Sequence, residues 1–388
     1  MSKKQFSALS LTCFSQGLGF SMIATFLGIY ADLFHLTGFQ IGVVTMAYSL
    51  TQFALLFPVA KSADRGKRKL LLLVGLLFGI PVYGAFWLAD GFWSLTTARF
   101  LQALTYPMTA LTALSFISLR SPAVNRGRNI GYYNMLKTAG RTIGAVVGGL
   151  LVGRYGFGAS YSTLMVLYGL GFIAVYFLVP PEEHESERAN PGNGLNLRDL
   201  LESDRFKIQI SFETAFSFAK AIIVVFIPVY AYAVLGLSEA QLGIVVASRY
   251  LPMVLGQGIT GKISDKIGRG PLIICGGLIS ILALLVLPSQ TTFESLIMIA
   301  FLVGIADTIR VPASWAVFAD EGVEKGAATS LSLRMLAWRP GMIAGPILGG
   351  LVQDYFGIQW TFYLAALAVA VSLVAYTGLS TRLSPRKN

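Results

Sequence analysis

The stretch GKISDKIGRGP at residues 261–271 recurs, in a weaker form, as AKSADRGKRKL at residues 60–70. Both stretches are charged turns between long apolar runs, and Asp64 aligns with Asp265 at an offset of 201 residues. The same offset aligns Arg68 with Arg269, residues 37–44 with 238–245, residues 92–101 with 293–302, and Gly144, Gly148 and Gly149 with Gly345, Gly349 and Gly350. A constant offset over so many landmarks indicates an internal duplication.

The composition is that of a membrane protein. Of the 388 residues, 55% are hydrophobic and 13% are charged, against about a quarter charged in soluble domains. Apolar segments of about 20 residues, long enough to cross a hydrocarbon core of about 30 Å, recur along the chain. We count twelve, at approximately residues 8–30, 41–60, 70–89, 94–115, 128–152, 159–179, 208–232, 240–262, 271–288, 293–315, 327–350 and 360–380. The predicted class is an all-α membrane protein with twelve transmembrane helices.

One sustained polar stretch, PEEHESERANPGNGLNLRDLLESDRF at residues 181–206, interrupts the apolar runs. Its Pro- and Gly-rich part is typical of a flexible linker, and its second part predicts a short amphipathic helix on the inner membrane face. The stretch divides the predicted helices six and six. We therefore predict two pseudo-symmetric six-helix bundles, over residues 1–180 and 207–388, joined by a cytoplasmic linker. In transporters built from such parallel repeats the substrate site lies between the halves.

The formal charge of +11 indicates orientation in a membrane rather than nucleic-acid binding. With the N-terminus in the cytoplasm and the helices alternating, Arg154 is the single base in the predicted outer loops. The predicted inner side holds Lys3, Lys4, Lys61, Arg65, Lys67, Arg68, Lys69, Arg120, Arg126, Arg128, Arg188, Arg198, Arg205, Lys207, Lys262, Lys266, Arg269, Lys325, Arg382, Arg386 and Lys387. This positive-inside bias predicts a multi-pass protein of the plasma (inner) membrane with both termini in the cytoplasm.

The two charged turns resemble the signature loop of the major facilitator superfamily, roughly G-x-x-x-D-[RK]-x-G-R-[RK]. The second copy carries the pattern on Gly261, Asp265, Lys266, Gly268 and Arg269. The first copy keeps Asp64, Arg65 and Arg68, but has Ala60 for the opening glycine and Gly66 for the inner one. The resemblance implies that these loops latch one half to the other in the outward-open state. The alternative is that their bases serve only the positive-inside rule.

Two glycine-rich stretches resemble the helix 5 motif G-x-x-x-G-P-x-x-G-G of the drug:proton antiporter branch of that superfamily. They are GRTIGAVVGG at 140–149, where Ala145 replaces the proline, and GMIAGPILGG at 341–350, which is intact. Small residues at this spacing let helices approach closely, and proline bends a helix. The helix-packing candidates are Gly144, Gly148, Gly149, Gly345, Pro346 and Gly349. Plain helix packing is the alternative to a branch-specific role.

LTTARFLQAL at 95–104 resembles the helix 4 pattern l-x-x-x-R-x-x-q-G, with Arg99 and Gln102 in place. The resemblance implies that Arg99 takes part in proton transfer. An arginine inside a span costs about 2.5 kcal/mol or more, so it normally faces a cavity or a partner. Because Arg99 lies near the outer end of its span, snorkelling to the surface is the alternative.

Ionisable residues inside the spans are the other candidates for function. The bases are Arg99, Lys137, Arg141, Lys220, Arg249, Arg310, Arg334 and Arg339, and the acids are Glu213 and Asp307. Asp307 either forms a local ion pair with Arg310, three residues away, or carries a proton or cation, because desolvation favours the protonated acid and a nearby arginine the carboxylate. Glu213 lies near the inner boundary, where an interfacial position is equally expected. The candidates for proton coupling are Asp307, Arg310, Arg99 and Glu213.

The excess of bases predicts a positive central cavity that favours anionic or zwitterionic molecules over cations. The substrate-cavity candidates are Gln102, Lys137, Arg141, Lys220, Arg249, Arg339 and Trp338. No nucleotide-binding loop or metal-ligand spacing is present in the sequence, which predicts a non-enzymatic protein without cofactor, driven by an ion or substrate gradient. The sequence favours a monomeric carrier that exports a small organic solute in exchange for protons. The alternatives are uptake, exchange or uniport of an anionic metabolite, and a receptor or scaffold that does not transport.

Overall fold

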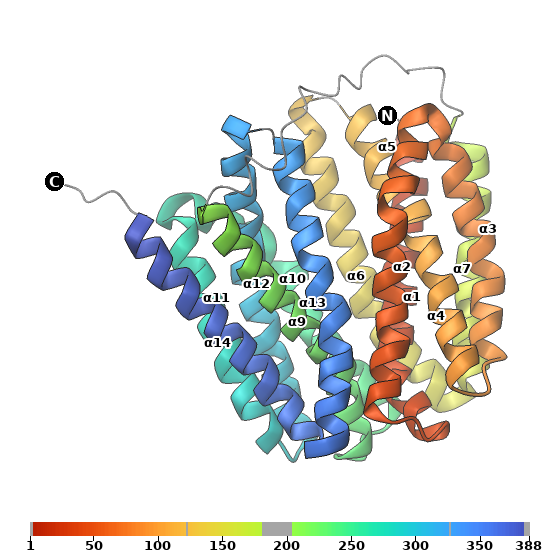
Figure 1. Ribbon diagram of the computed structural model, residues 1–388. Helices are drawn as coiled ribbons and strands as arrows, with labels where there is room; N and C mark the ends of the chain where they lie inside the picture. Colours follow the sequence, from red (N-terminus) through yellow and green to blue (C-terminus); the bar gives the residue numbers. More distant parts are fainter. Residues whose placement is uncertain (1–2, 122, 181–203, 326, 384–388) are drawn as a thin grey trace.

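The computed structural model describes residues 3–121, 123–180, 204–325 and 327–383, and these residues are almost entirely helical (Figure 1). The first half contains α1 (Lys3–Leu33), α2 (Gly38–Ser62), α3 (Arg68–Trp87), α4 (Phe92–Tyr106), α5 (Thr112–Arg120), α6 (Ala123–Tyr155) and α7 (Phe157–Leu178). The second half contains α9 (Asp204–Ala233), α10 (Glu239–Ile267), α11 (Arg269–Val286), α12 (Phe293–Lys325), α13 (Ala327–Phe356) and α14 (Ile358–Leu383). The predicted all-α membrane fold is confirmed.

The helices α4 and α5 form one membrane crossing, because a π-helical turn at Pro107–Leu111 joins them. Proline cannot donate the backbone hydrogen bond of a regular helix, and a one-turn widening accommodates it. Among the described residues, eleven helical segments are long and apolar enough to cross a membrane. The 29-residue α10 also has the length of a membrane crossing, and it carries Arg249 near its centre.

The helix α1 begins, and α14 ends, at the same end of the bundle, which we call the terminus side (Figure 1). The turn between α2 and α3 and the turn between α10 and α11 also lie on this side. Gly66 in the first turn has φ 77° and Gly268 in the second has φ 89°, a backbone region that favours glycine. The moved glycine of the first charged turn therefore still serves a left-handed backbone position. The predicted linker helix, residues 195–206, lies outside the described residues except for 204–206, which form the beginning of α9.

Two equivalent interfaces join the halves, α2 with α13 and α6 with α10, and α1 also packs against α9. At the first, a Cβ on Gly42 would overlap the carbonyl of Pro346. At the second, a Cβ on Gly243 would overlap the carbonyl of Ala145, and both members of this pair are offset by 201 residues from those of the first. Because glycine has no side chain, the backbones of the two halves come into contact at these positions.

These close contacts lie on the side of the bundle remote from the termini, which we call the opposite side. There the Asp354 carboxylate, at the end of α13, accepts hydrogen bonds from the backbone N–H groups of Gly38 at 2.5 Å and Phe39 at 2.8 Å. It thus caps the N-terminus of α2 across the boundary between the halves, where the helix dipole favours negative charge. The carboxylate and the glycine contacts together close the opposite side.

The terminus side is arranged differently. Among the described hydrogen bonds between α2 and α13, the one nearest the terminus side joins Arg339 to Gln52 at 2.9 Å, near the middle of both helices. Beyond this bond the ribbons of α2 and α13 diverge toward the terminus side (Figure 1). Gly261, in the second charged turn, would meet nothing within 4 Å even with a Cβ. The described structure is closed on the opposite side and separated on the terminus side.

We predict that Gly243→Ala forces the opposite side apart, because the added methyl group overlaps the Ala145 carbonyl and overpacking costs about 1–3 kcal/mol. Spin labels would be attached to cysteines introduced at Asp90 and Thr291, with Cys13 and Cys275 replaced. Double electron–electron resonance would then report a longer distance between the two labels, one on each half. The control is Gly131→Ala, because a Cβ there would meet nothing within 4 Å. Equal distance distributions in both variants would contradict the packing argument.

Candidate functional site

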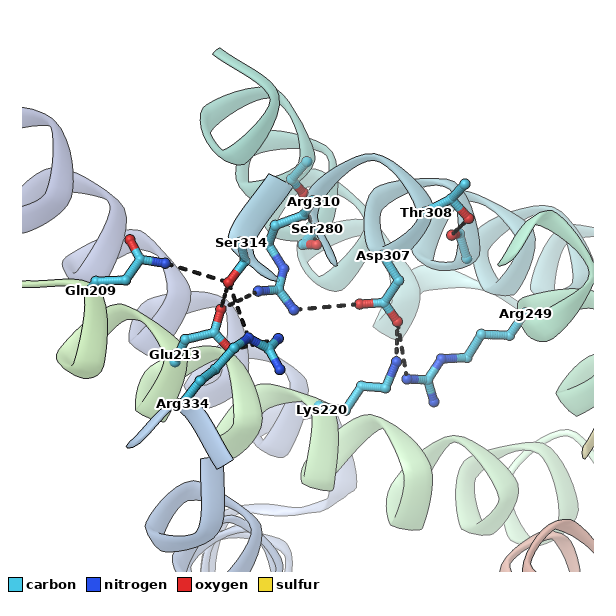
Figure 2. A network of polar contacts seen from close by, with 12 residues as sticks. Gln209, Glu213, Lys220, Arg249, Ser280, Asp307, Thr308, Arg310, Ser314 and Arg334 are labelled. Carbon is cyan, nitrogen blue, oxygen red and sulfur yellow. Dashed lines mark hydrogen bonds and ion pairs between the residues drawn. The ribbon is translucent and has the colours of Figure 1, made fainter. Parts of the chain in front are cut away.

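Glu213 on α9 is the centre of the first buried charge cluster (Figure 2). Its carboxylate lies 3.2 Å from Nη1 of Arg310 on α12 and 3.1 Å from Nη2 of Arg334 on α13. The Ser314 hydroxyl donates a hydrogen bond to it, and Gln209 donates to that hydroxyl at 3.4 Å. The side chain of Glu213 is 0% exposed, so it is buried among these partners. Two guanidinium groups compensate one buried carboxylate here.

Asp307 on α12 is the centre of the second cluster. Lys220 of α9 forms a hydrogen-bonded ion pair with its carboxylate, and Arg249 of α10 approaches to 3.6 Å. Arg310 lies 3.9 Å away, so the local pair expected from the sequence is only the most distant of the three contacts. Since Arg310 contacts Glu213 as well, it joins the two clusters into one network (Figure 2).

The network has a net positive charge when all its groups are ionised. Four bases, Lys220, Arg249, Arg310 and Arg334, face the two acids Glu213 and Asp307. The Nε and Nη2 atoms of Arg249 are buried and have no hydrogen-bond partner. Buried cations without full compensation hold a positive potential around the middle of α10 and α12, where a mobile anion or a proton change on an acid would act strongly.

Arg99 in the first half has a different environment. It is 3% exposed, donates a hydrogen bond to Gln102 at 2.9 Å and lies 5.4 Å from the ring centroid of Tyr48. The snorkelling alternative is therefore wrong. Gln102 is itself 4% exposed and bound to Arg99, so the structure places it inside the first half rather than on the cavity between the halves.

Three further cations have no acidic partner within the described part of the chain. They are Lys137 and Arg141 of α6 and Arg339 of α13. Arg141 stacks over Phe20 at 4.5 Å and reaches Tyr250 of the other half at 5.9 Å. Arg141 therefore contacts aromatic rings of both halves.

A small cavity lies between α1, α9 and α10, and its wall includes Tyr250, the ring that Arg141 approaches. Its walls also include Arg249 and the hydroxyls of Ser21 and Thr25, which are buried without a hydrogen-bond partner. Most of the remaining lining is aliphatic, from Ile223, Val224, Ile227, Val245 and Val246.

The other predicted residues lie elsewhere. Gly144 and Gly148 pack on α1, Gly149 on α10, and Gly345 and Gly349 on α9, while Pro346 meets α2. Trp338 lies 5.7 Å from Arg334, beside Trp315 in the first charge cluster. Of the latch candidates, Arg65 and Lys266 are exposed and Arg68 donates to Ser115 at 3.3 Å. The side chains of Asp64 and Asp265 are outside the described part of the structure, so the latch role stays a prediction.

Sequence reasoning missed several polar residues because they carry no charge. Gln52 accepts the inter-half bond from Arg339, and Gln16 donates to Thr105 at 3.3 Å and to Thr109 at 2.5 Å. A count of glutamines inside apolar spans would have found Gln52 and Gln16, since an amide in a span also needs a partner. Among the described residues, no group of His, Cys, Asp or Glu could hold a metal ion.

Buried ion networks and a cavity between two helical bundles define a polytopic membrane transporter. The model of the Major Facilitator Superfamily matches residues 9–210 and 210–388, and the chain belongs to this family. An uncharacterized MFS-type transporter of Methanocaldococcus jannaschii is 23% identical, with 96% of this chain and 98% of its own covered. The multidrug resistance protein MdtG of Proteus mirabilis is 24% identical, with 97% and 95% covered, which fits the drug:proton antiporter branch.

Solved structures show the same fold. A bacterial homologue of the human lysosomal transporter Spinster, in an inward-facing and occupied conformation, aligns with a TM-score of 0.84 at 17% identity, covering 98% of each chain. The nucleoside transporter NupG aligns with a TM-score of 0.83 at 14% identity, covering 97% of this chain and 99% of its own. The family model confirms the superfamily that the two charged turns resemble, and these structures agree with the predicted fold.

We predict that Glu213→Gln destabilises the second half by about 3–5 kcal/mol, because it leaves Arg310 and Arg334 buried without their carboxylate. Thermal unfolding of the detergent-purified protein, followed by tryptophan fluorescence, would show a lowered Tm. Glu294→Gln, at an exposed position in the first turn of α12, is the matched control and should leave the Tm unchanged. A Tm for Glu213→Gln within error of the wild type would mean that the cluster adds nothing to stability.

Proposed function

We propose that this chain is a proton-coupled secondary transporter that exports a small organic solute by alternating access. The observation that carries the proposal is the Asp307 carboxylate, 5% exposed and held by Lys220 and Arg249 beside the cavity between the halves. Protonation of Asp307 would remove the negative charge that holds both cations, so its proton state would be coupled to the charge of the cavity wall. Export is supported by the relatives named as multidrug resistance proteins.

Alternating access is supported by the paired interfaces. The contacts that close the opposite side are backbone approaches at Gly42 and Gly243 and the cap by Asp354, and none of them is covalent. The resemblance of the charged turns to a latch on the terminus side supplies contacts for the other state. Interfaces of this kind let two rigid bundles rock about a fixed site.

We propose that the terminus side is cytoplasmic. Among the described residues, the turns of this side carry bases such as Arg65, Lys67 and Lys266. The turns and helix ends of the opposite side carry Asp32, Asp90, Glu239, Glu294 and Asp354, with Arg154 as their base. This asymmetry supports the positive-inside orientation. In that orientation the structure is inward-facing.

A second candidate function is uptake, exchange or uniport of an anionic metabolite. It is favoured by the same cations, because Lys137, Arg141 and Arg339 have no acidic partner in the described part of the chain. An anion that enters with a proton would find both its charge and its proton acceptor in one cavity. The direction of proton movement during substrate flux separates the two candidates.

We predict that Asp307→Asn abolishes proton movement coupled to substrate flux. The asparagine amide fills the same space as the carboxylate, but it does not take up and release a proton near neutral pH. The measurement is lumenal pH in proteoliposomes that contain a pH-sensitive dye, after addition of a substrate found by thermal-shift screening. Asp32→Asn, at an exposed position, is the matched control and should keep coupling. Flux that ignores a pH gradient in the wild type and persists in Asp307→Asn would contradict proton coupling.

Cysteine labelling in intact cells tests the proposed orientation. In a chain with Cys13 and Cys275 replaced, a cysteine at Asp90 should react with a membrane-impermeant maleimide. A cysteine at Lys67 should react only after the membrane is permeabilised, because its turn lies on the terminus side. The reverse pattern would overturn the assigned orientation without affecting the fold.

A further inference from the structure

The small cavity between α1, α9 and α10 is lined by three buried polar residues with unused hydrogen-bond donors. Ser21 is 1% exposed, Thr25 is 0% exposed and Arg249 is 4% exposed. Within the described part of the chain, the two hydroxyls and the Nε and Nη2 atoms of Arg249 have no hydrogen-bond partner. Buried polar atoms are normally hydrogen-bonded, because leaving one unpaired is costly. These donors therefore indicate a ligand that accepts hydrogen bonds.

The hydroxyls of Ser21 and Thr25 differ from those of Thr12 and Ser15 on the same helix. Thr12 donates to the carbonyl three residues earlier at 2.7 Å, and Ser15 to the carbonyl four residues earlier at 2.9 Å. Such bonds to the helix backbone are usual for hydroxyl side chains in helices. Ser21 and Thr25 make no such bond among the described residues, although they lie one turn apart on one face of α1. Both hydroxyls can therefore donate to a ligand in the cavity.

The internal duplication shows that packing alone does not require these polar residues. At the offset of 201 residues, all three align with apolar or aromatic residues. The pairs are Ser21 with Ile222, Thr25 with Phe226 and Arg249 with Tyr48. The repeated fold thus accommodates large apolar side chains at the equivalent places, and the polar set belongs to this cavity alone of the two.

The charge next to the cavity favours a negative ligand. Arg249 lies 3.6 Å from the Asp307 carboxylate, which also forms ion pairs with Lys220 and Arg310 (Figure 2). Across the whole buried network four bases face two acids, and Arg249 is the base of this network that lines the cavity. A guanidinium can only donate hydrogen bonds. An anion would accept from it and would also compensate part of the excess positive charge.

The size of the cavity limits the ligand to a small ion. The cavity has room for a water molecule or an ion of similar size, but not for an organic solute. Most of its other walls are aliphatic, from Ile223, Val224, Ile227, Val245 and Val246. These side chains offer no acceptor for the hydrogens of a water molecule, whereas a halide needs donors only.

We propose that this cavity binds a chloride-sized inorganic anion, held by Arg249 and by the hydroxyls of Ser21 and Thr25. Because α1 belongs to the first half and α9 and α10 to the second, the anion would contact both halves. The lining residues of these helices lie between the helix middles and the opposite side. The anion would therefore stabilise the state that is closed on the opposite side. The site does not rest on the proposed transport function.

The test is a chloride titration of the detergent-purified full chain at constant ionic strength. Sodium gluconate is the replaced salt, because gluconate is too large for the cavity. The Tm, followed by tryptophan fluorescence, should rise by about 2 °C or more and reach a plateau, since a ligand of the folded state stabilises that state. Bromide should give a similar rise.

The variants Thr25→Val and Ser21→Ala each remove one hydroxyl from the cavity. Each should raise the chloride concentration of the half-maximal effect by about fivefold or more, whereas Thr25→Ser should keep most of the response. Thr45→Val is the matched control and should leave this concentration unchanged. Its hydroxyl on α2 is also buried without a partner among the described residues, but Thr45 does not line the cavity.

Equal Tm values in chloride and gluconate would mean that water alone occupies the cavity, and would overturn the anion site. An unchanged half-maximal concentration in both Thr25→Val and Ser21→Ala would overturn it as well. If these variants unfold, anomalous scattering from wild-type crystals grown in bromide locates the ion directly. Bromide between α1, α9 and α10 would support the site, and bromide found only elsewhere, or nowhere, would overturn it. None of these measurements uses a transported solute, so a failure of the proposed transport function would not change their outcome.

Discussion

The structure depends on how charge is compensated inside a bundle that water and lipid cannot solvate. In the second half two carboxylates hold four cations, and Arg310 bridges Glu213 and Asp307 so that neither cluster can change alone. Breaking one such pair leaves a charge buried, which costs far more than an exposed ion pair is worth. The positions of α9, α12 and α13 relative to one another are therefore tied to the protonation and occupancy of this network.

The duplication makes this charge pattern interpretable, because the two halves share their backbone contacts but not their charges. The contact of Gly42 with Pro346 corresponds to that of Gly243 with Ala145, so the proline can be lost from one copy without loss of the close approach. In contrast, Arg99 aligns with Ala300, and Arg249 aligns with Tyr48, the ring that faces Arg99. The packing between the halves is therefore symmetric, whereas the buried charged residues differ from one half to the other.

The helices, the duplication and the charged residues inside the spans could be predicted, because hydropathy and a constant offset are read directly along the sequence. Which of these charged residues form ion pairs with one another could not be predicted. Glu213 and Lys220 share a face of α9, yet Glu213 binds Arg310 and Arg334, whereas Lys220 binds Asp307. The partners depend on the rotation of α9 against α12, which no spacing rule gives. Glycine spacing likewise predicted close approach but not its target, since Gly144 meets α1 and Gly149, little more than a turn away, meets α10.

The sign of coupling follows from what the substrate does to Lys220 and Arg249. A cationic solute would compete with the proton for Asp307, so that binding of one disfavours the other, and such a linkage drives exchange in opposite directions. An anion that draws Lys220 and Arg249 away from Asp307 would leave that carboxylate without its cations and favour its protonation, so that anion and proton would travel together. An anion confined to Lys137, Arg141 and Arg339 would act on Asp307 only through the field across the cavity, and its coupling would be correspondingly weak. If Asp307 carries the coupled proton, export driven by proton entry requires a substrate that competes with the proton at Asp307, whereas an anion that reaches Lys220 or Arg249 would favour uptake.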